Sequence, residues 1–195
     1  MKKVVLHAQS KKLSEQAYQY AVVEIRCQCL FAMETFKNIT KKGEGEKIMT
    51  FSSIHSFLTH CANISKILWS RPNPKYPGVT FKEVIGENVS DRLRIGGSSP
   101  IKDMEHRDGL DHYDERIVRW VKDALSRNGK KEIPIVDLTI GEKHFSDALY
   151  LRHYDPEAGL FTFIGKELNL KVLYDEVVRI NGIVRGPTIS INGLK

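Results

Sequence analysis

The sequence has little cysteine, and its cysteines do not fit a disulfide framework. Only three occur in 195 residues, Cys27, Cys29 and Cys61, and no two of them form a C-x-x-C pair. Disulfide-rich domains and structural zinc sites use paired cysteines at close, regular spacing. We therefore expect these residues to be small apolar side chains in the interior of a protein from a reducing compartment.

Long hydrophobic runs are also absent. The first twelve residues, MKKVVLHAQSKK, hold only a three-residue apolar run before charge returns. A signal peptide or a membrane span needs a much longer run, so the sequence predicts a cytoplasmic protein without a membrane anchor. The sequence also contains no P-loop, no dinucleotide-binding fingerprint and no nucleophile elbow. These absences leave kinase, dehydrogenase and esterase functions without support.

The composition is that of a folded protein with a basic surface. Hydrophobic residues make up 41% and charged residues 28% of the chain, and the formal net charge is +6. A chain of this length forms one domain, or one domain with an elaboration, and buries a sizeable core. The positive charge favours an anionic partner such as nucleic acid.

Helical spacing dominates the first two thirds of the chain. Apolar residues recur every three or four positions over 14–38 and 47–69, and a shorter helix is expected over 81–95, ending at Gly96-Gly97. RPNPKYPG (71–78) has three prolines and must be a loop. Ser99 and Pro100 suit the N-cap and first position of a further helix, which Asn128-Gly129 would end.

The last third changes character. IPIVDLTIG (133–141), ALYLRHY (148–154) and LFTFIG (160–165) are typical of strands, with DPEAG (155–159) as a turn. A final helix is expected over 170–184. The predicted fold is mainly α: a bundle of about four helices over residues 1–130, with a small strand-and-helix extension over 131–195 that packs on it.

The helix expected from Ser99 to Asn128 contains HRDGLDHYDERIVRW (106–120), which is dense in ionisable groups. At 100° per residue its apolar and polar residues separate onto two faces. The apolar face comprises Leu110, Tyr113, Ile117, Trp120, Val121 and Ala124. The polar face comprises Arg107, Asp108, Asp111, His112, Glu115 and Arg119.

Two interpretations of the polar face remain open. In the first, the face is a solvated surface with helical ion pairs, such as Arg107 with Asp111. Such pairs occur on helices that have no binding or catalytic function. Alternatively, it is a site in which Arg107 and His112 combine a permanent cation with a group that titrates near neutral pH. Gly109 favours the second, because glycine inside a helix costs about 1 kcal/mol relative to alanine and permits close approach of another chain or a substrate.

The stretch RDGLDH, from Arg107 to His112, resembles the R-x4-H motif of the HEPN superfamily (higher eukaryote and prokaryote nucleotide-binding domains). Asp108 occupies the polar position that follows the arginine in that motif. FLTHCANISKILW (57–69) and YDERIVRW (113–120) are similar to segments of uncharacterised bacterial proteins of this kind. The resemblance covers roughly residues 10–128.

The resemblance implies a HEPN-like helical bundle and a metal-independent endoribonuclease of the toxin or defence type, needing no cofactor. Two protomers of such a homodimer would place both motifs in one cleft. It implies that His112 is a general acid or base, that Arg107 binds the phosphate, and that Asp108 orients them. An antitoxin or other regulatory protein is a further expected partner.

Other polar residues are weaker candidates. Arg94 and Arg116 are predicted to bind substrate phosphates, and Arg92 and Arg119 are further candidates, although a solvated role suits each of them equally. His106 is a possible second proton donor or a structural residue. The pair His60 and Asn63 is either an interface pair or a satisfied buried pair.

Other function classes compete with the nuclease. One is a catalytically inactive HEPN-like module that binds a nucleotide or a protein. Another is metal-dependent hydrolysis by His106, His112, Asp111 and Asp114, but a helix would point the two histidines about 120° apart. A sequence-specific DNA binder is the third, and the spread of basic residues disfavours it.

Overall fold

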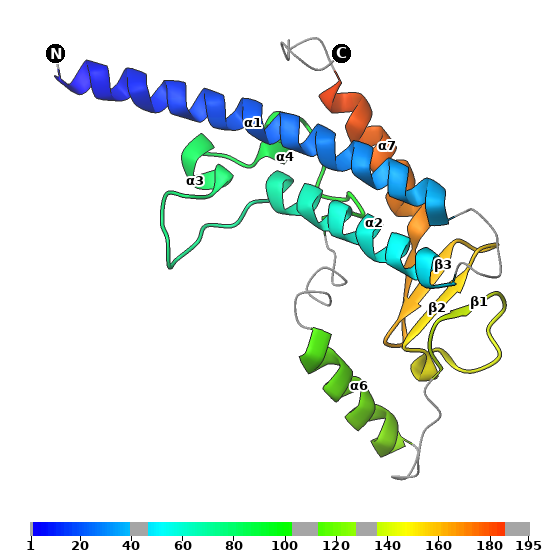
Figure 1. Cartoon of the computed structure of the whole chain (residues 1–195). Helices are drawn as coiled ribbons and strands as arrows, with labels where there is room; N and C mark the ends of the chain where they lie inside the picture. Colours follow the sequence, from blue (N-terminus) through cyan, green and yellow to red (C-terminus); the bar gives the residue numbers. More distant parts are fainter. Residues whose placement is uncertain (1, 40–46, 103–112, 128–135, 186–195) are drawn as a thin grey trace.

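The structure, a computed structural model, describes residues 2–39, 47–102, 113–127 and 136–185. Its helices in this part of the chain are α1 (Lys2–Ile39), α2 (Lys47–Leu68), α3 (Phe81–Ile85), α4 (Val89–Arg92), α6 (Tyr113–Arg127) and α7 (Leu170–Val184). The protein is mainly α, as the sequence predicts (Figure 1).

The remaining regular structure is a small sheet. Its strands are β1 (Thr139–Ile140), β2 (Arg152–Asp155), β3 (Leu160–Phe163) and β4 (Lys166–Asn169), and a 3-10 turn, η2 (Asp147–Leu149), precedes β2. The strands lie in the order β1-β2-β3-β4. β1 pairs parallel to β2, and the other two pairings are antiparallel.

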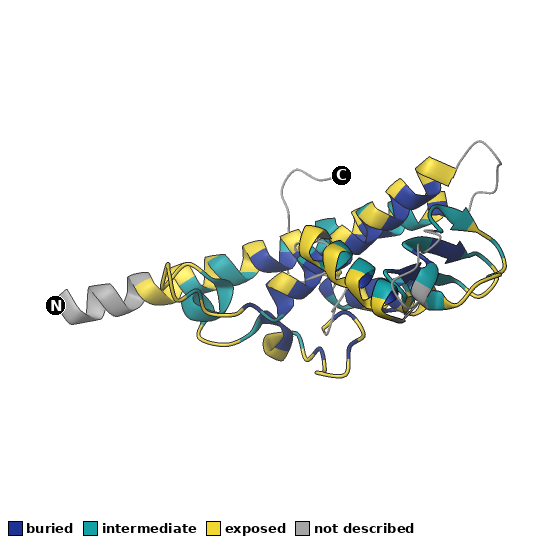
Figure 2. Ribbon diagram, turned by 90° about the horizontal axis from the view of Figure 1, so that it is seen from below, coloured by how far each residue is buried: buried dark blue, intermediate teal, exposed yellow. Residues whose placement is uncertain are grey.

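The long helix α1 organises the core. It packs along α2, which returns beside it as a hairpin, and along α7 from the other end of the sequence (Figure 1). Ala21, Ile25 and Cys29 of α1 are completely buried in one hydrophobic cluster, to which α2, α7 and the sheet also contribute. Buried residues concentrate where these elements overlap, whereas residues 10–13 of α1 are exposed (Figure 2).

One face of the sheet completes this core. Tyr154 of β2 and Phe161 of β3 are register partners and belong to the hydrophobic cluster. Because side chains alternate along a strand, His153 and Thr162 face the opposite side. Both are completely buried there as well, so the sheet has an apolar face toward the helices and a buried polar row on its other face.

Several helix predictions are confirmed. The final helix spans Leu170–Val184 as expected, with Asn169 as its N-cap accepting from the Val172 amide. The second helix ends within one residue of the prediction. The first begins at Lys2 rather than near residue 14. Among the described helices, none combines the length and apolar character that crossing a membrane requires.

Two helix predictions are wrong. The helix expected over 81–95 is two short helices, because Gly86 adopts a left-handed φ of 90° and ends α3. Ser99 does not cap a helix: residues 100–102 form a turn, and the Ser99 hydroxyl donates to a side chain of α7 instead. Only the predicted start at Ser99 is therefore wrong: Tyr113–Arg127 of the predicted helix are helical, as α6, and residues 103–112 lie outside the described residues.

The strand predictions are partly confirmed. β1, β2 and β3 each lie within one of the three expected segments, and DPEAG leads through the turn between β2 and β3. Residues 147–149 form η2 rather than a strand, and β4 was not expected, because KELN is polar and short. The domain boundary near residue 130 falls outside the described residues and stays a prediction.

Candidate functional site

The predicted catalytic residues Arg107, Asp108 and His112 lie outside the described residues, as do His106 and Asp111. Their roles therefore stay predictions. The structure does describe the chain on both sides of the motif, namely the turn at Ser99–Lys102 and helix α6 from Tyr113 onward. These two flanks show how the fold holds the ends of the segment.

The upstream flank is anchored in the core at three points. Ile101 is completely buried in the hydrophobic cluster. Ser65 of α2 donates to the carbonyl oxygen of Lys102 at 3.4 Å, and Ser99 donates to Oε1 of Glu176 on α7 at 2.5 Å. The chain therefore enters the motif from a fixed position between α2 and α7.

Glu176 is the buried charge in this anchor, with 8% of its surface exposed. Burial acts to raise its pKa, but hydrogen bonds from Arg179 and Ser99 and the charge of Arg179 outweigh burial and hold the pKa below its usual value. Arg179 donates to both carboxylate oxygens, at 2.6 and 2.8 Å. Such a paired carboxylate remains ionised near neutral pH.

The downstream flank is amphipathic. Trp120 and Ala124 are buried, each with 6% exposure, which confirms the predicted apolar face at these two positions. Glu115 and Arg119 are exposed, as expected for the polar face, and Arg116 is half-buried. Arg116 lies one helical turn beyond His112 in sequence, so its predicted contact with substrate stays a prediction.

Arg92, the last residue of α4, and Arg94, two residues beyond it, lie in different surroundings. Arg92 pairs with Glu15 at 2.9 Å and with Glu87 at 3.6 Å, and its guanidinium lies 4.1 Å from the centroid of the Tyr18 ring. These contacts fasten α4 to α1 and give Arg92 a structural role. Arg94 is exposed and has a left-handed φ of 56°, a conformation that non-glycine residues rarely adopt.

The pair His60 and Asn63 lies at the seam between α1 and α2. His60 Nδ1 is 2.8 Å from Oε1 of Gln28 on α1, and the Asn63 amide donates to the same oxygen at 3.3 Å. Gln28 in turn donates to Glu24 at 2.7 Å. His60 and Asn63 are therefore a hydrogen-bonded pair within one chain, of intermediate rather than full burial, and a contact with another chain stays a prediction.

A second histidine cluster, around His153, was not predicted. His153 is completely buried, its Nδ1 is 2.8 Å from the Thr139 hydroxyl, and its ring centroid is 4.6 Å from that of Tyr150. Its Nε2 and the hydroxyl of Thr162 find no hydrogen-bond partner within the described part of the chain. A histidine between alternating strand residues was the only sequence signal for this cluster.

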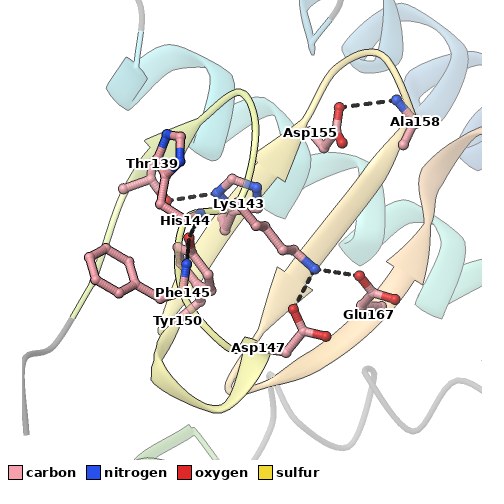
Figure 3. A network of polar contacts seen from close by, with 10 residues as sticks. Thr139, Lys143, His144, Phe145, Asp147, Tyr150, Asp155, Ala158 and Glu167 are labelled. Carbon is pink, nitrogen blue, oxygen red and sulfur yellow. Dashed lines mark hydrogen bonds and ion pairs between the residues drawn. The ribbon is translucent and has the colours of Figure 1, made fainter.

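A capping loop, residues 141–150, covers this polar row. Lys143 reaches from the loop to pair with Asp147 at 2.7 Å and also with Glu167 of β4 (Figure 3). The Tyr150 hydroxyl accepts from the amides of His144 and Phe145, at 2.9 and 3.2 Å, which closes the loop on itself. These contacts shut His153 away from solvent, so it is not accessible to a large substrate.

Two of the three cysteines are buried as the sequence predicts, whereas Cys27 has intermediate exposure. Cys29 and Cys61 are completely buried, and burial raises the pKa of the Cys29 thiol to about 12. Burial raises the pKa of Cys61 as well. A thiol is nucleophilic only as the thiolate, so these two cysteines are not suited to catalysis. Over the described ranges, no group of three or more metal-ligating side chains forms a candidate metal site.

In comparisons with known proteins, no protein family, no curated protein and no solved structure gave a match to this chain.

Proposed function

We propose that the protein is a metal-independent endoribonuclease of the HEPN type, acting as a homodimer in a toxin or defence role. The observation that carries this proposal is the RDGLDH sequence, in which Arg107 and His112 are separated by four residues. The mainly helical fold and the formal net charge of +6 are consistent with it. So is the firm anchoring of Ser99–Lys102 immediately before the motif.

In this proposal His112 takes a proton from a ribose 2′-hydroxyl, and the 2′-oxygen attacks the adjacent phosphorus. The bond from phosphorus to the 5′-oxygen breaks, and that oxygen leaves with a proton. The products are a 2′,3′-cyclic phosphate and a 5′-hydroxyl end. Arg107 binds the phosphate and stabilises the charge that builds on its oxygens, for which a forked guanidinium is suited.

Asp108 orients His112 or Arg107 in this scheme, and Arg94 and Arg116 bind flanking phosphates. The exposure of Arg94 supports this role, because a long cationic side chain on the surface is free to meet a strand of RNA. Arg92 is less suited, since Glu15, Glu87 and Tyr18 already surround its guanidinium.

The test is incubation of the purified protein with mixed RNA in EDTA, beside the His112→Ala and Arg107→Ala variants. General acid–base catalysis contributes roughly 10²–10⁴ in rate, so His112→Ala should remove nearly all cleavage. Analysis of the product ends should show cyclic phosphates from the parent protein alone. Full-rate cleavage by both variants would contradict the assignment.

Absence of cleavage by a folded, dimeric protein would favour the second function, a HEPN-like module that binds a nucleotide or a partner protein without cutting RNA. A module of this kind should keep its affinity for that ligand when His112 is replaced by alanine. Dimerisation itself is measured independently of activity, by light scattering.

A further inference from the structure

The seam between α1 and α2 contains a chain of polar side chains that ends at His60, a residue of intermediate exposure. Glu24, Gln28 and His60 follow one another by hydrogen bonds of 2.7 and 2.8 Å, and Asn63 joins at Gln28. Glu24 and Gln28 are four residues apart on α1, and His60 and Asn63 are three apart on α2. Each pair therefore lies on one helix face.

This chain determines which nitrogen of His60 carries the proton. The Glu24 carboxylate only accepts, so the Gln28 group facing it must be the amide NH₂. The Gln28 oxygen therefore faces His60, and Nδ1 must donate to it. Burial lowers the pKa of His60, so the ring is neutral at pH 7 and its Nε2 holds a lone pair.

An exposed aromatic ring stands beside this acceptor. Phe31 has 53% of its surface exposed, lies one turn beyond Gln28 on α1, and its ring centroid is 5.5 Å from that of His60, tilted by 50°. Phe31 is not part of the hydrophobic core. A role limited to joining the two helices would need the His60–Gln28 bond but not a phenylalanine in solvent.

We propose that Phe31 and His60 form a binding subsite for an unpaired nucleobase of RNA. The base would stack on the Phe31 ring and donate an N–H from its edge to Nε2 of His60. Unpaired bases are commonly recognised by stacking on aromatic rings combined with hydrogen bonds to their edges. The choice of RNA as the ligand rests on the proposed ribonuclease function. The hydrogen-bond acceptor, His60 Nε2, and the Phe31 ring are features of the structure and do not depend on that function.

The charge at this position fits a base better than a phosphate. Glu24 places a carboxylate at the end of the polar chain opposite His60, and none of the four side chains of the chain is a permanent cation. A phosphate would be repelled there, while an amino or imino group of a base would not. The subsite would therefore contribute to affinity and base preference without adding to the electrostatic contact with the backbone.

Two substitutions separate this role from a structural one. His60→Asn keeps a side-chain N–H near the Nδ1 position for Gln28 but removes Nε2 and the ring. Phe31→Leu keeps an apolar side chain and removes the aromatic face. Tyr76→Leu is the matched control, because Tyr76 is similarly exposed, at 56%, on the loop before α3.

The binding experiment uses full-length protein carrying His112→Ala, so that RNA is not cut, and a fluorescein-labelled single-stranded RNA of mixed sequence. Fluorescence anisotropy should show that Phe31→Leu and His60→Asn each weaken binding by roughly 5- to 100-fold, which is the usual effect of losing one stacked base. The dependence of affinity on salt should stay unchanged, because no phosphate contact is lost. Tyr76→Leu should bind as the parent does.

Unchanged affinity in both folded variants, checked by circular dichroism, would overturn the subsite even where the parent cleaves RNA. The tautomer is tested separately by ¹⁵N NMR of histidine-labelled protein, which should place the proton of His60 on Nδ1. A proton on Nε2 would also overturn the inference. If the parent neither binds nor cuts RNA, the proposed function fails, and titration with guanosine and uridine monophosphates then decides the subsite: shifts of the His60 ring resonances support it, and their absence contradicts it.

Discussion

At the scale of single residues, burial changes the pKa of the His153 imidazole, and this change should affect the stability of the fold. Burial and the charge of Lys143 lower its pKa, against smaller opposing effects of Asp155, Asp147 and the Gly141 backbone. Lys143 is itself paired with Asp147 and Glu167. The groups around the imidazole therefore keep it neutral in the folded state, although the unfolded chain would protonate it at mildly acidic pH.

The first stability prediction concerns this residue. A group whose pKa is lower in the folded state binds its proton more readily in the unfolded chain, so stability is lost as pH falls below about 6.5. The slope for one such group reaches about 1.4 kcal/mol per pH unit. We expect His153→Asn, which can still bond Thr139, to reduce the slope, as measured by urea unfolding between pH 7.5 and 5.

His60 provides the comparison for this experiment, because burial lowers its pKa as well. His60→Asn should remove the share of the slope that His60 contributes, and the double variant should be the least sensitive to acid. A wild-type slope that persists unchanged in His153→Asn would contradict the prediction.

At the scale of elements, Glu176 joins α7 to the turn that precedes the predicted catalytic segment. Replacing it with glutamine removes the charge that Arg179 and Ser99 share, which should cost about 1–3 kcal/mol. The amides of Ile101 and Lys102 should then exchange hydrogen faster, as measured by mass spectrometry.

The control for Glu176→Gln is the neighbouring substitution Asp175→Asn. Asp175 is exposed and pairs with Lys171 on the surface of α7, so this change should alter stability by less than about 0.5 kcal/mol. Equal effects of the two substitutions would show that the Ser99 turn does not depend on the buried carboxylate.

The elements also show how far the sequence predicts the fold. The helix Leu170–Val184 was predictable because its apolar residues keep helical spacing and Asn169 caps it locally. Ser99 was misread because serine before proline suits an N-cap, whereas its actual partner, Glu176, is 77 residues away. Local signals determine helix ends well only when the capping partner is local.

The same distinction applies to the candidate sites. The sequence singled out His60 and Asn63, but their partner Gln28 depends on how α1 and α2 align side by side. The strand position of His153 was its only local signal, and its burial under a loop was not predictable from the strand alone. The Arg107 and His112 prediction rests on sequence alone, because both lie outside the described residues.

At the scale of the whole molecule, the hairpin, α7 and the sheet share one hydrophobic cluster. Ile180 is completely buried in it, so Ile180→Ala should lower the free energy of unfolding by about 2–5 kcal/mol. The exposed neighbour Val178 provides the control, and Val178→Ala should cost far less.

Unfolding of Ile180→Ala should remain a single transition, because the sheet and the hairpin meet in the same cluster. Tryptophan fluorescence and far-ultraviolet circular dichroism should give coincident midpoints. Two separated transitions would show instead that the sheet and α7 unfold independently of the hairpin.

The packing of α7 against α1 also has a consequence for biosynthesis. The ribosome completes the hairpin long before it makes Glu176, so the Ser99 turn acquires its partner only near the end of the described chain. We expect nascent chains to expose the apolar face of the hairpin until α7 emerges, and to depend on chaperones during that interval. Under the proposed ribonuclease function, this order would delay completion of the turn before the predicted catalytic segment until most of the chain has left the ribosome.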